Sequence, residues 1–395
     1  MALSELGMIA DLHCHYPMHL VADEPDAGGL KEGWLSRFVD KVEGGILDVV
    51  AKVVNDAGWS SGWRVSLEGL KTGGAGIVCS VLYWPASEFD PLHLNGEPPL
   101  DGDYEYLKRQ LEFVENSLPD ATSDGTPVFV AKTAADLERP GIRFVNCIEG
   151  GFQLGADIAM LDERVRWLSQ QGVLYITVAH LFYRQIATEA PAIPAFTDQE
   201  FLGIFPEPGD VGLTEFGEKL IETMYRHKIL VDISHMSERA VQETFELVER
   251  LDQGNPRTNY PIIATHVGMR SAGPTSRAQE YNLADATARK IAERDGVIGL
   301  IASQHQLGDT HSESDSAALI KAHLDAIGAA VGDASSVAAL GTDIDGFIKP
   351  TLKGLEKAEN LTKLEAWVRN AEQSNPEAIL HGNAERVSKA AFAGR

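Results

Sequence analysis

The feature that most constrains the fold of this chain is a set of eight short segments rich in Val, Ile and Leu, each about as long as a buried strand. Segments with helical periodicity lie between most of them. Strand–helix alternation repeated eight times predicts a parallel sheet closed into a (β/α)8 barrel, the TIM-barrel class of α/β fold. A doubly wound open sheet is the alternative, which the lack of a glycine-rich dinucleotide motif after the first strand disfavours. The expected strands are residues 8–15, 75–84, 142–149, 173–180, 229–235, 261–266, 297–303 and 337–343.

The rest of the chain is expected to complete a single barrel domain over residues 1–395. Helices are predicted at residues 104–118, 216–226, 240–251, 286–292 and 317–331, with Thr214 and Ser237 as N-caps. Two loop insertions, residues 16–34 and 182–213, follow the first and fourth strands. Both leave the C-terminal ends of strands, so they are candidate lids or pocket walls at that face of the barrel. Residues 361–393 are expected to add C-terminal helices outside the barrel.

The net charge and the cysteine content indicate which binding partners and which cellular compartment to expect. The net charge of −24 argues against nucleic acid and anionic membrane surfaces as partners. We expect no membrane segment, because neither a leader-like start nor an apolar run of about 20 residues is visible. An odd number of cysteines in strand-like segments (Cys14, Cys79 and Cys147) predicts reduced, buried thiols and a cytoplasmic protein.

Histidines and acidic residues gather at the predicted C-terminal strand ends. His13 and His15 end the first strand, and residues two apart on a strand point to the same face. Five of the 12 histidines fall at such ends, which form the rim where barrel enzymes place their sites. Nitrogen ligands with one carboxylate suit zinc, with cobalt, nickel, manganese or iron as alternatives. The predicted metal ligands are His13, His15, Glu149, His235 and His266.

Three further residues are candidates for catalysis or substrate binding. His180 closes the fourth strand, Asp343 closes the eighth, and Arg270 follows His266 by four residues. Each also has an ordinary structural explanation. His180 alone would be better explained as a core histidine, Asp343 as a turn residue and Arg270 as a surface side chain. Glu149 could likewise cap a helix or pair with an arginine.

Several ordered motifs resemble the membrane (renal) dipeptidases, peptidase family M19 of the amidohydrolase superfamily. The resemblance runs from about Asp11 to about Val387, and its blocks are residues 147–151, 212–217, 230–237, 261–266, 340–346 and 382–387. It implies two zinc ions bridged by Glu149, one held by His13 and His15 and the other by the remaining two predicted ligands. It also implies that His180 polarises the scissile carbonyl, that Arg270 binds a substrate carboxylate and that Asp343 transfers protons.

The first strand departs from the family pattern. The dipeptidases have His-x-Asp there, whereas this chain has His13-x-His15, which makes the site one charge unit more positive. The fold is therefore expected more firmly than dipeptide specificity. The predicted substrate is a small molecule with a free carboxylate, such as a dipeptide or an N-acyl amino acid. A homodimer is the oligomeric state we consider.

Two other functions remain open. A lactonase or phosphotriesterase shares the barrel and the metal chemistry, but such enzymes often bridge their metals with a carboxylated lysine. Here Glu149 occupies the expected place, and Lys132 lies before the third strand. A non-catalytic metal-binding protein is the other alternative, and it would not need Asp343 as a proton shuttle.

Overall fold

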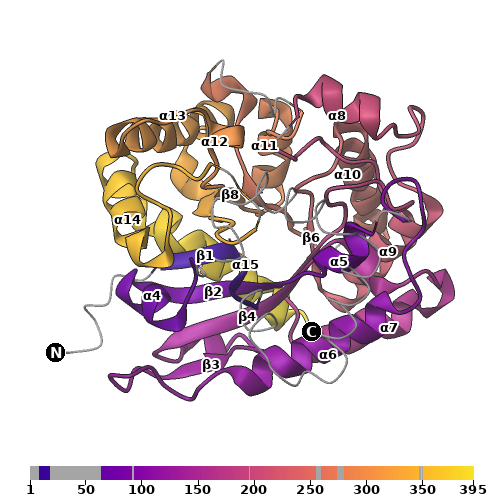
Figure 1. Cartoon of the computed structure of the whole chain (residues 1–395), viewed down its shortest axis with the longest axis horizontal. Coiled ribbons are helices and arrows are strands. Elements are labelled where there is room, and N and C mark those ends of the chain that lie inside the picture. Colours follow the sequence, from indigo (N-terminus) through magenta and orange to yellow (C-terminus); the bar gives the residue numbers. More distant parts are fainter. Residues whose placement is uncertain are drawn as a thin grey trace, which may run out of the picture.

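The computed structural model describes residues 9–17, 64–90, 93–194, 196–254, 259–273, 280–346, 348 and 350–395. Within them, eight parallel strands form a closed barrel, in which β2 pairs with β1 on one side and with β4 on the other (Figure 1). Six consecutive residue pairs, from Ile77–Arg143 to Leu82–Ile148, join β2 to β4 and close it. The predicted (β/α)8 barrel is confirmed. Its strands are β1 Ile9–Cys14, β2 Ala75–Leu82, β4 Ile142–Glu149, β5 Tyr175–Thr177, β6 Leu230–Asp232, β7 Ile262–Val267, β8 Ile298–Leu300 and β9 Ala338–Leu340.

One strand was not predicted. The three-residue strand β3, Val128–Val130, pairs in parallel with the beginning of β4 and lies outside the eight-strand ring. A strand of three residues has too few side chains to show an alternating pattern, so periodicity could not reveal it.

Four of the predicted strands, 173–180, 229–235, 297–303 and 337–343, extend three residues beyond the ends of β5, β6, β8 and β9. His180, His235 and Asp343 each lie three residues beyond the last strand residue, which is residue 177, 232 or 340 respectively. His235 has φ +67° and Asp343 has φ +57°, so the chain leaves the strand through a left-handed turn at both. These turns lie beyond the ends of β6 and β9 and direct both side chains over the mouth of the barrel.

The predicted helices are confirmed, with small shifts at their ends. Thr214 accepts a hydrogen bond from the Gly217 amide and Ser237 accepts one from the Ala240 amide, so both are N-caps as predicted. The α-helices are α4 Leu67–Thr72, α5 Pro85–Glu88, α6 Asp103–Ser117, α7 Leu161–Gln170, α8 Asp198–Ile204, α9 Glu215–His227, α10 Glu238–Gln253, α11 Asp285–Glu293, α12 Gln304–Leu307, α13 Glu313–Val331, α14 Leu361–Asn370 and α15 Asn383–Ala393. Short 3-10 turns are Asp136–Glu138, Gly151–Leu154, Ile158–Met160, Arg270–Ala272, Ala334–Ser336 and Ala358–Asn360, and Ala378–Gly382 is a π-helix.

The C-terminal helix α15 closes the end of the barrel opposite the site. Its apolar residues pack in one cluster with inward-facing strand residues such as Leu12 and Cys147. The Asn383 side chain donates to the Ala338 carbonyl, where β9 begins, and Arg386 donates to carbonyls just before β8. Burial of this apolar face stabilises the closed barrel at the end where the strands begin. The C-terminal segment is therefore helical, as predicted.

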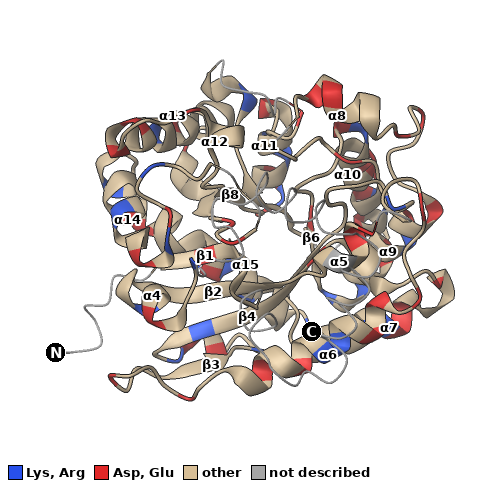
Figure 2. Ribbon diagram, in the orientation of Figure 1, with Lys and Arg blue, Asp and Glu red and all other residues tan. Residues whose placement is uncertain are grey.

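Charged side chains lie mainly on the outer helices, and acidic residues are prominent on α7 and α8 (Figure 2). All three cysteines are free and buried, as predicted. None of the described helices is long and apolar enough to cross a membrane. The insertion at 182–213 contains α8 and contributes wall residues to the site, whereas most of the insertion predicted at 16–34 lies outside the described residues.

Candidate metal centre and active site

The carboxylate of Glu149 lies among five imidazoles at the mouth of the barrel. Glu149 ends β4 and is only 2% exposed. The sequence motif Gly150-Gly151 follows it, and Gly150 has φ +93°, a conformation that favours glycine. The shortest distances from a carboxylate oxygen to Nε2 are 3.1 Å for His13, 3.2 Å for His15, 3.2 Å for His180, 3.4 Å for His266 and 3.6 Å for His235.

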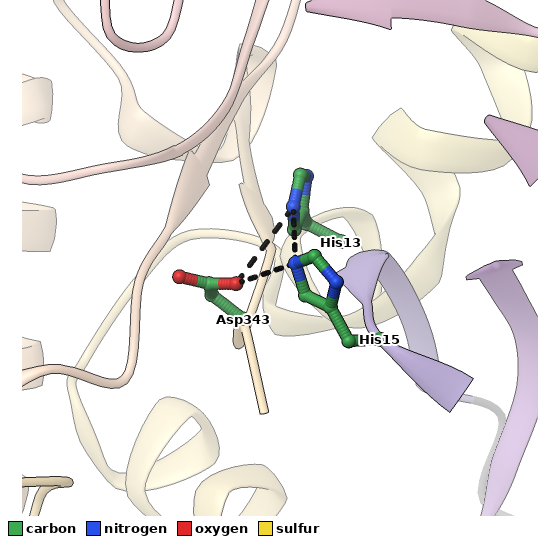
Figure 3. A group of neighbouring side chains, drawn as sticks. All are labelled: His13, His15 and Asp343. Atoms are coloured by element: carbon green, nitrogen blue, oxygen red, sulfur yellow. Dashed lines mark hydrogen bonds and ion pairs between the residues drawn. The ribbon is translucent and has the colours of Figure 1, made fainter. Parts of the chain in front are cut away.

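Pairs of imidazole nitrogens face each other in a way that suits a shared cation. Nε2 of His13 lies 3.3 Å from Nε2 of His15, and Nε2 of His235 lies 2.9 Å from Nε2 of His266. Two nitrogen ligands of one tetrahedral zinc ion, with bonds of ~2.0–2.1 Å, lie about 3.3 Å apart. Oδ1 of Asp343 lies 3.2 Å from Nε2 of His15 and 3.7 Å from Nε2 of His13 (Figure 3). The donor atoms therefore converge as they would around bound metal.

Hydrogen bonds on the far side of two rings fix their tautomers. The Thr265 hydroxyl donates to Asp232 at 2.7 Å, so it must accept from Nδ1 of His266 at 2.7 Å and from Nδ1 of His13 at 3.1 Å. The Tyr175 hydroxyl donates to a backbone carbonyl and also accepts from Nδ1 of His13 at 3.0 Å. With the proton on Nδ1, both rings turn the Nε2 lone pair toward Glu149, which is the form that ligates metal.

The electrostatics of the cluster follow from burial and from neighbouring charges. Burial raises the pKa of Glu149, but the charges of His180 and His13 outweigh it and hold that pKa well below its usual range. Burial and the charge of His13 lower the pKa of His266 well below its usual range, and burial together with the charge of His180 lowers the pKa of His235. Glu149 is therefore ionised while the rings of His235 and His266 are neutral, and these are the protonation states that metal ligation requires.

His180 lies on the loop after β5 and has a carboxylate partner that the sequence analysis missed. Its Nδ1 lies 2.5 Å from Oε2 of Glu88, the last residue of α5. Glu88 belongs to no motif, and its position shortly after the second strand was the only signal that could have pointed to it. Asp232 and Thr265 were also missed as functional residues, although both lie inside segments that carried the family resemblance.

Asp343 is held over the site by its backbone. Its amide donates to the His13 carbonyl at 2.8 Å, and the amide of the preceding Thr342 donates to Asp11. A Cβ at Gly346 would lie 1.8 Å from Oδ1 of Asp343 and 2.6 Å from a ring carbon of His15, so only glycine fits there. The structure thus brings together all five predicted ligands, His180 and Asp343.

Comparison with known families decides the identity of the chain. The sequence matches the model of the membrane dipeptidases, peptidase family M19, over residues 7–393. The chain belongs to this family. The predicted resemblance is therefore confirmed.

Known relatives agree with this assignment. "Dipeptidase aclJ" of Aspergillus oryzae is 25% identical over 243 residues, which cover 61% of this chain and 49% of the relative, so the match spans about half of its length. A solved dipeptidase of family M19 superimposes with a TM-score of 0.68 at 18% identity, covering 97% of this chain and 98% of the other. A metallopeptidase of Rhodobacter sphaeroides, solved with a phosphinate mimic of L-Ala-D-Ala, gives a TM-score of 0.65 at 18% identity, with 96% and 98% covered. At these identities the two structures support the fold of this family member.

A cavity opens beside the cluster of this dipeptidase-family chain. Its volume is about 400 Å³, part of it open to solvent, and its wall includes His180, His235 and Asp343. The rest of the wall is largely apolar. The uncharged members of the wall are Phe89, Leu181, Ala192, Ile193, Pro194, Tyr281, Ile301, Gln306, Gly346 and Ile348.

Arg270, the predicted carboxylate-binding residue, lies at the start of a 3-10 turn after β7. Its guanidinium donates to the Asn282 carbonyl at 2.7 Å, to the Glu280 carbonyl at 3.0 Å and to Oε2 of Glu238 at 2.9 Å. It is not part of the cavity wall formed by the described residues. The Glu238 side chain is 71% exposed, so a substrate carboxylate could exchange with it. The predicted role of Arg270 stays a prediction.

Proposed function

We propose that this protein is a metal-dependent hydrolase that cleaves the amide bond of dipeptides or N-acyl amino acids. The observation that carries the proposal is the convergence of five imidazole Nε2 atoms on Glu149, with the Asp343 carboxylate 3.2 Å from one of them, Nε2 of His15. Membership of the membrane dipeptidase family supports the same reaction class.

The donor set fits two divalent ions, with zinc the best match to nitrogen ligands and one carboxylate. In this proposal His13 and His15 would hold one ion, His235 and His266 would hold the other, and Glu149 would contribute to holding both. Such ions would act as Lewis acids and would lower the pKa of bound water toward ~7. The remaining steps depend on side chains of the chain itself.

Asp343 is proposed to move the proton. Its left-handed backbone conformation and the hydrogen bond that its backbone amide donates to the His13 carbonyl aim the carboxylate at the cluster and at the cavity together. There it can take a proton from the attacking water and return it to the nitrogen of the leaving amine, the usual two-way role of a positioned carboxylate.

His180 is proposed to bind the oxygen of the scissile carbonyl. Burial opposes protonation, but the charges of Glu149 and Glu88 outweigh it and raise the pKa of His180 to about 10. A protonated ring donates from Nδ1 to Glu88 and from Nε2 to the substrate. Placed at the cavity wall, that donor stabilises negative charge as it develops on the oxygen.

The cavity wall suggests the chemistry of the substrate side chain. Apart from the proposed catalytic residues, its described members carry no charge. Transfer of an unpaired charge from water into such a wall is costly, whereas an apolar side chain gains from burial. We propose substrates with apolar side chains and a free carboxylate, the latter bound by Arg270. Three free, buried cysteines support a cytoplasmic location for the enzyme.

A substrate panel on the metal-reconstituted protein tests the proposed function. Dipeptides and N-acyl amino acids with apolar side chains should be hydrolysed with higher kcat/KM than those with charged side chains, and amidation of the carboxylate should lower kcat/KM. Lactones and phosphotriesters belong in the same panel, because fast hydrolysis of those with no amide cleavage would establish the alternative enzyme class. A metal-loaded protein that cleaves none of these compounds would contradict the proposal.

A further inference from the structure

Glu88 is a buried carboxylate that is not among the proposed metal ligands. It is 0% exposed, although it lies in the loop region between β2 and α6. Four donors surround it. Oε2 is 2.5 Å from Nδ1 of His180 and accepts from the Tyr83 hydroxyl at 2.8 Å, and Oε1 accepts from the backbone amides of Leu181 at 2.9 Å and Phe182 at 3.3 Å.

This arrangement is more specific than the fold alone requires. A charged carboxylate without partners in the interior is strongly destabilising, so its site must supply donors. Here three of the four donors come from the consecutive residues 180–182. Glu88 therefore joins the loop after β2 to the loop after β5 across the intervening β4, and the His180 ring lies between Glu88 and Glu149.

The contacts of the His180 ring show what this junction achieves. Nδ1 is held by Glu88, while Nε2 on the opposite edge lies 3.2 Å from Oε2 of Glu149. The Tyr83 ring packs edge-on against the His180 ring at a centroid distance of 4.7 Å, and the Tyr83 hydroxyl is tied to the same Glu88 oxygen. Because the carboxylate only accepts, the proton on Nδ1 is fixed and the ring cannot flip.

We propose that Glu88 is a positioning residue that holds the His180 ring so that Nε2 faces the scissile bond, with Tyr83 and the two loop amides holding Glu88 in turn. This inference rests on the proposed function of His180. It adds that the contribution of Glu88 to turnover is made through His180 alone.

The conservative substitution Glu88→Gln keeps the size of the side chain but removes its negative charge and one of its two acceptor oxygens. In Glu88→Gln the amide oxygen can replace only one of the two carboxylate oxygens. The NH₂ group then faces donors, either the backbone amides of Leu181 and Phe182 or Nδ1–H of His180 and the Tyr83 hydroxyl. The ring should keep its place less well, and kcat should fall by about 10–100-fold, the range for loss of an orienting partner. KM and metal content should stay close to the wild-type values.

A double-mutant cycle with His180→Asn provides the test. If Glu88 acts through His180, Glu88→Gln should lower kcat less than about 2-fold in the His180→Asn background, because coupled residues are not additive. The matched control is Asp103→Asn. Asp103 is also buried and anchors α5 by accepting from the Ser87 hydroxyl at 2.8 Å, and it makes no described contact with His180. Its effect should be the same in both backgrounds.

Full additivity of Glu88→Gln and His180→Asn would overturn the positioning role. If no substrate is cleaved, that result counts against the proposed function only. The positioning role of Glu88 can then still be tested by NMR. A downfield proton resonance from Nδ1–H of His180 should appear in the NMR spectrum of the wild-type protein. It should disappear in His180→Asn and shift in Glu88→Gln, and its absence from the wild type would also overturn the inference.

Discussion

The substitution Thr265→Val tests how the metal ligands are prepared. The Thr265 hydroxyl accepts hydrogen bonds from Nδ1–H of His13 and of His266, which are proposed ligands of different ions, and donates its own hydrogen bond to Asp232. Valine has nearly the same shape as threonine but replaces the hydroxyl with a methyl group. The change therefore removes these hydrogen bonds and leaves the packing of β7 close to native.

The size of the effect follows from the partners that remain. Asp232 keeps hydrogen bonds from Thr177 at 2.6 Å and Ser234 at 2.8 Å, and His13 keeps the Tyr175 hydroxyl at 3.0 Å. Only Nδ1 of His266 loses the one partner that it has among the described residues. An unsatisfied buried donor costs about 1–3 kcal/mol, or roughly 5- to 150-fold in an equilibrium constant. We expect one of two metal ions to bind about 10–100-fold more weakly, which is the usual loss of affinity when a hydrogen-bond partner of a metal ligand is removed.

Competition with a chromophoric chelator measures this loss, and the melting temperature of the metal-free protein controls for the fold. Thr265→Ser should restore affinity, because it restores the hydroxyl. Tyr175→Phe is the matched control, since His13 then keeps Thr265 at 3.1 Å, and it should weaken metal binding less. Native affinity for both ions in Thr265→Val would refute the proposed tautomers and their role.

Three further predictions concern the proton shuttle, its glycine neighbour and the substrate carboxylate. Asp343→Asn should retain the fold and lower kcat by ~10²–10⁴, measured by steady-state kinetics, and near-native turnover would reduce Asp343 to a turn residue. Gly346→Ala should lower kcat by displacing Asp343, whose oxygen would lie 1.8 Å from the new Cβ, and a crystal structure with Asp343 unmoved would contradict this. Arg270→Lys should lower kcat/KM for free-acid substrates and leave amidated ones unchanged, because lysine lacks the planar fork. Equal losses on both would mean that Arg270 only holds Glu238 and the adjacent loop carbonyls.

The histidine that replaces the family's aspartate at the first strand lies next to another carboxylate. His15 stands where the family pattern has an acidic residue, yet Oδ1 of Asp343 lies 3.2 Å from its Nε2. Burial opposes protonation of His15, but hydrogen bonds from its ring to Asp343 and Glu149 outweigh it and raise its pKa to about 9. Two carboxylates therefore flank this imidazole and offset part of the added positive charge.

Sequence patterning predicted the barrel, and it predicted that the candidate ligands lie together, because both depend on local signals. Apolar segments ending in His15, Glu149 and His266 place those side chains at strand ends, whatever the details of the loops. Glu88 could not be found in this way, because its importance depends on a contact with His180, 92 residues away in sequence. The true ends of β5, β6 and β9 were also missed, because the left-handed turns that follow two of these strands occur at residues other than glycine.

The most direct test of the account is the number of ions that the chain binds. Wild-type protein reconstituted with zinc, freed of loose metal and assayed by elemental analysis should contain two ions per chain, as a bridged site requires. Glu149→Gln removes the carboxylate that lies within 3.6 Å of five imidazole nitrogens, and it should lower the affinity for both ions rather than for one. A fully active wild-type protein without metal, or a Glu149→Gln variant that still binds two ions tightly, would contradict the account.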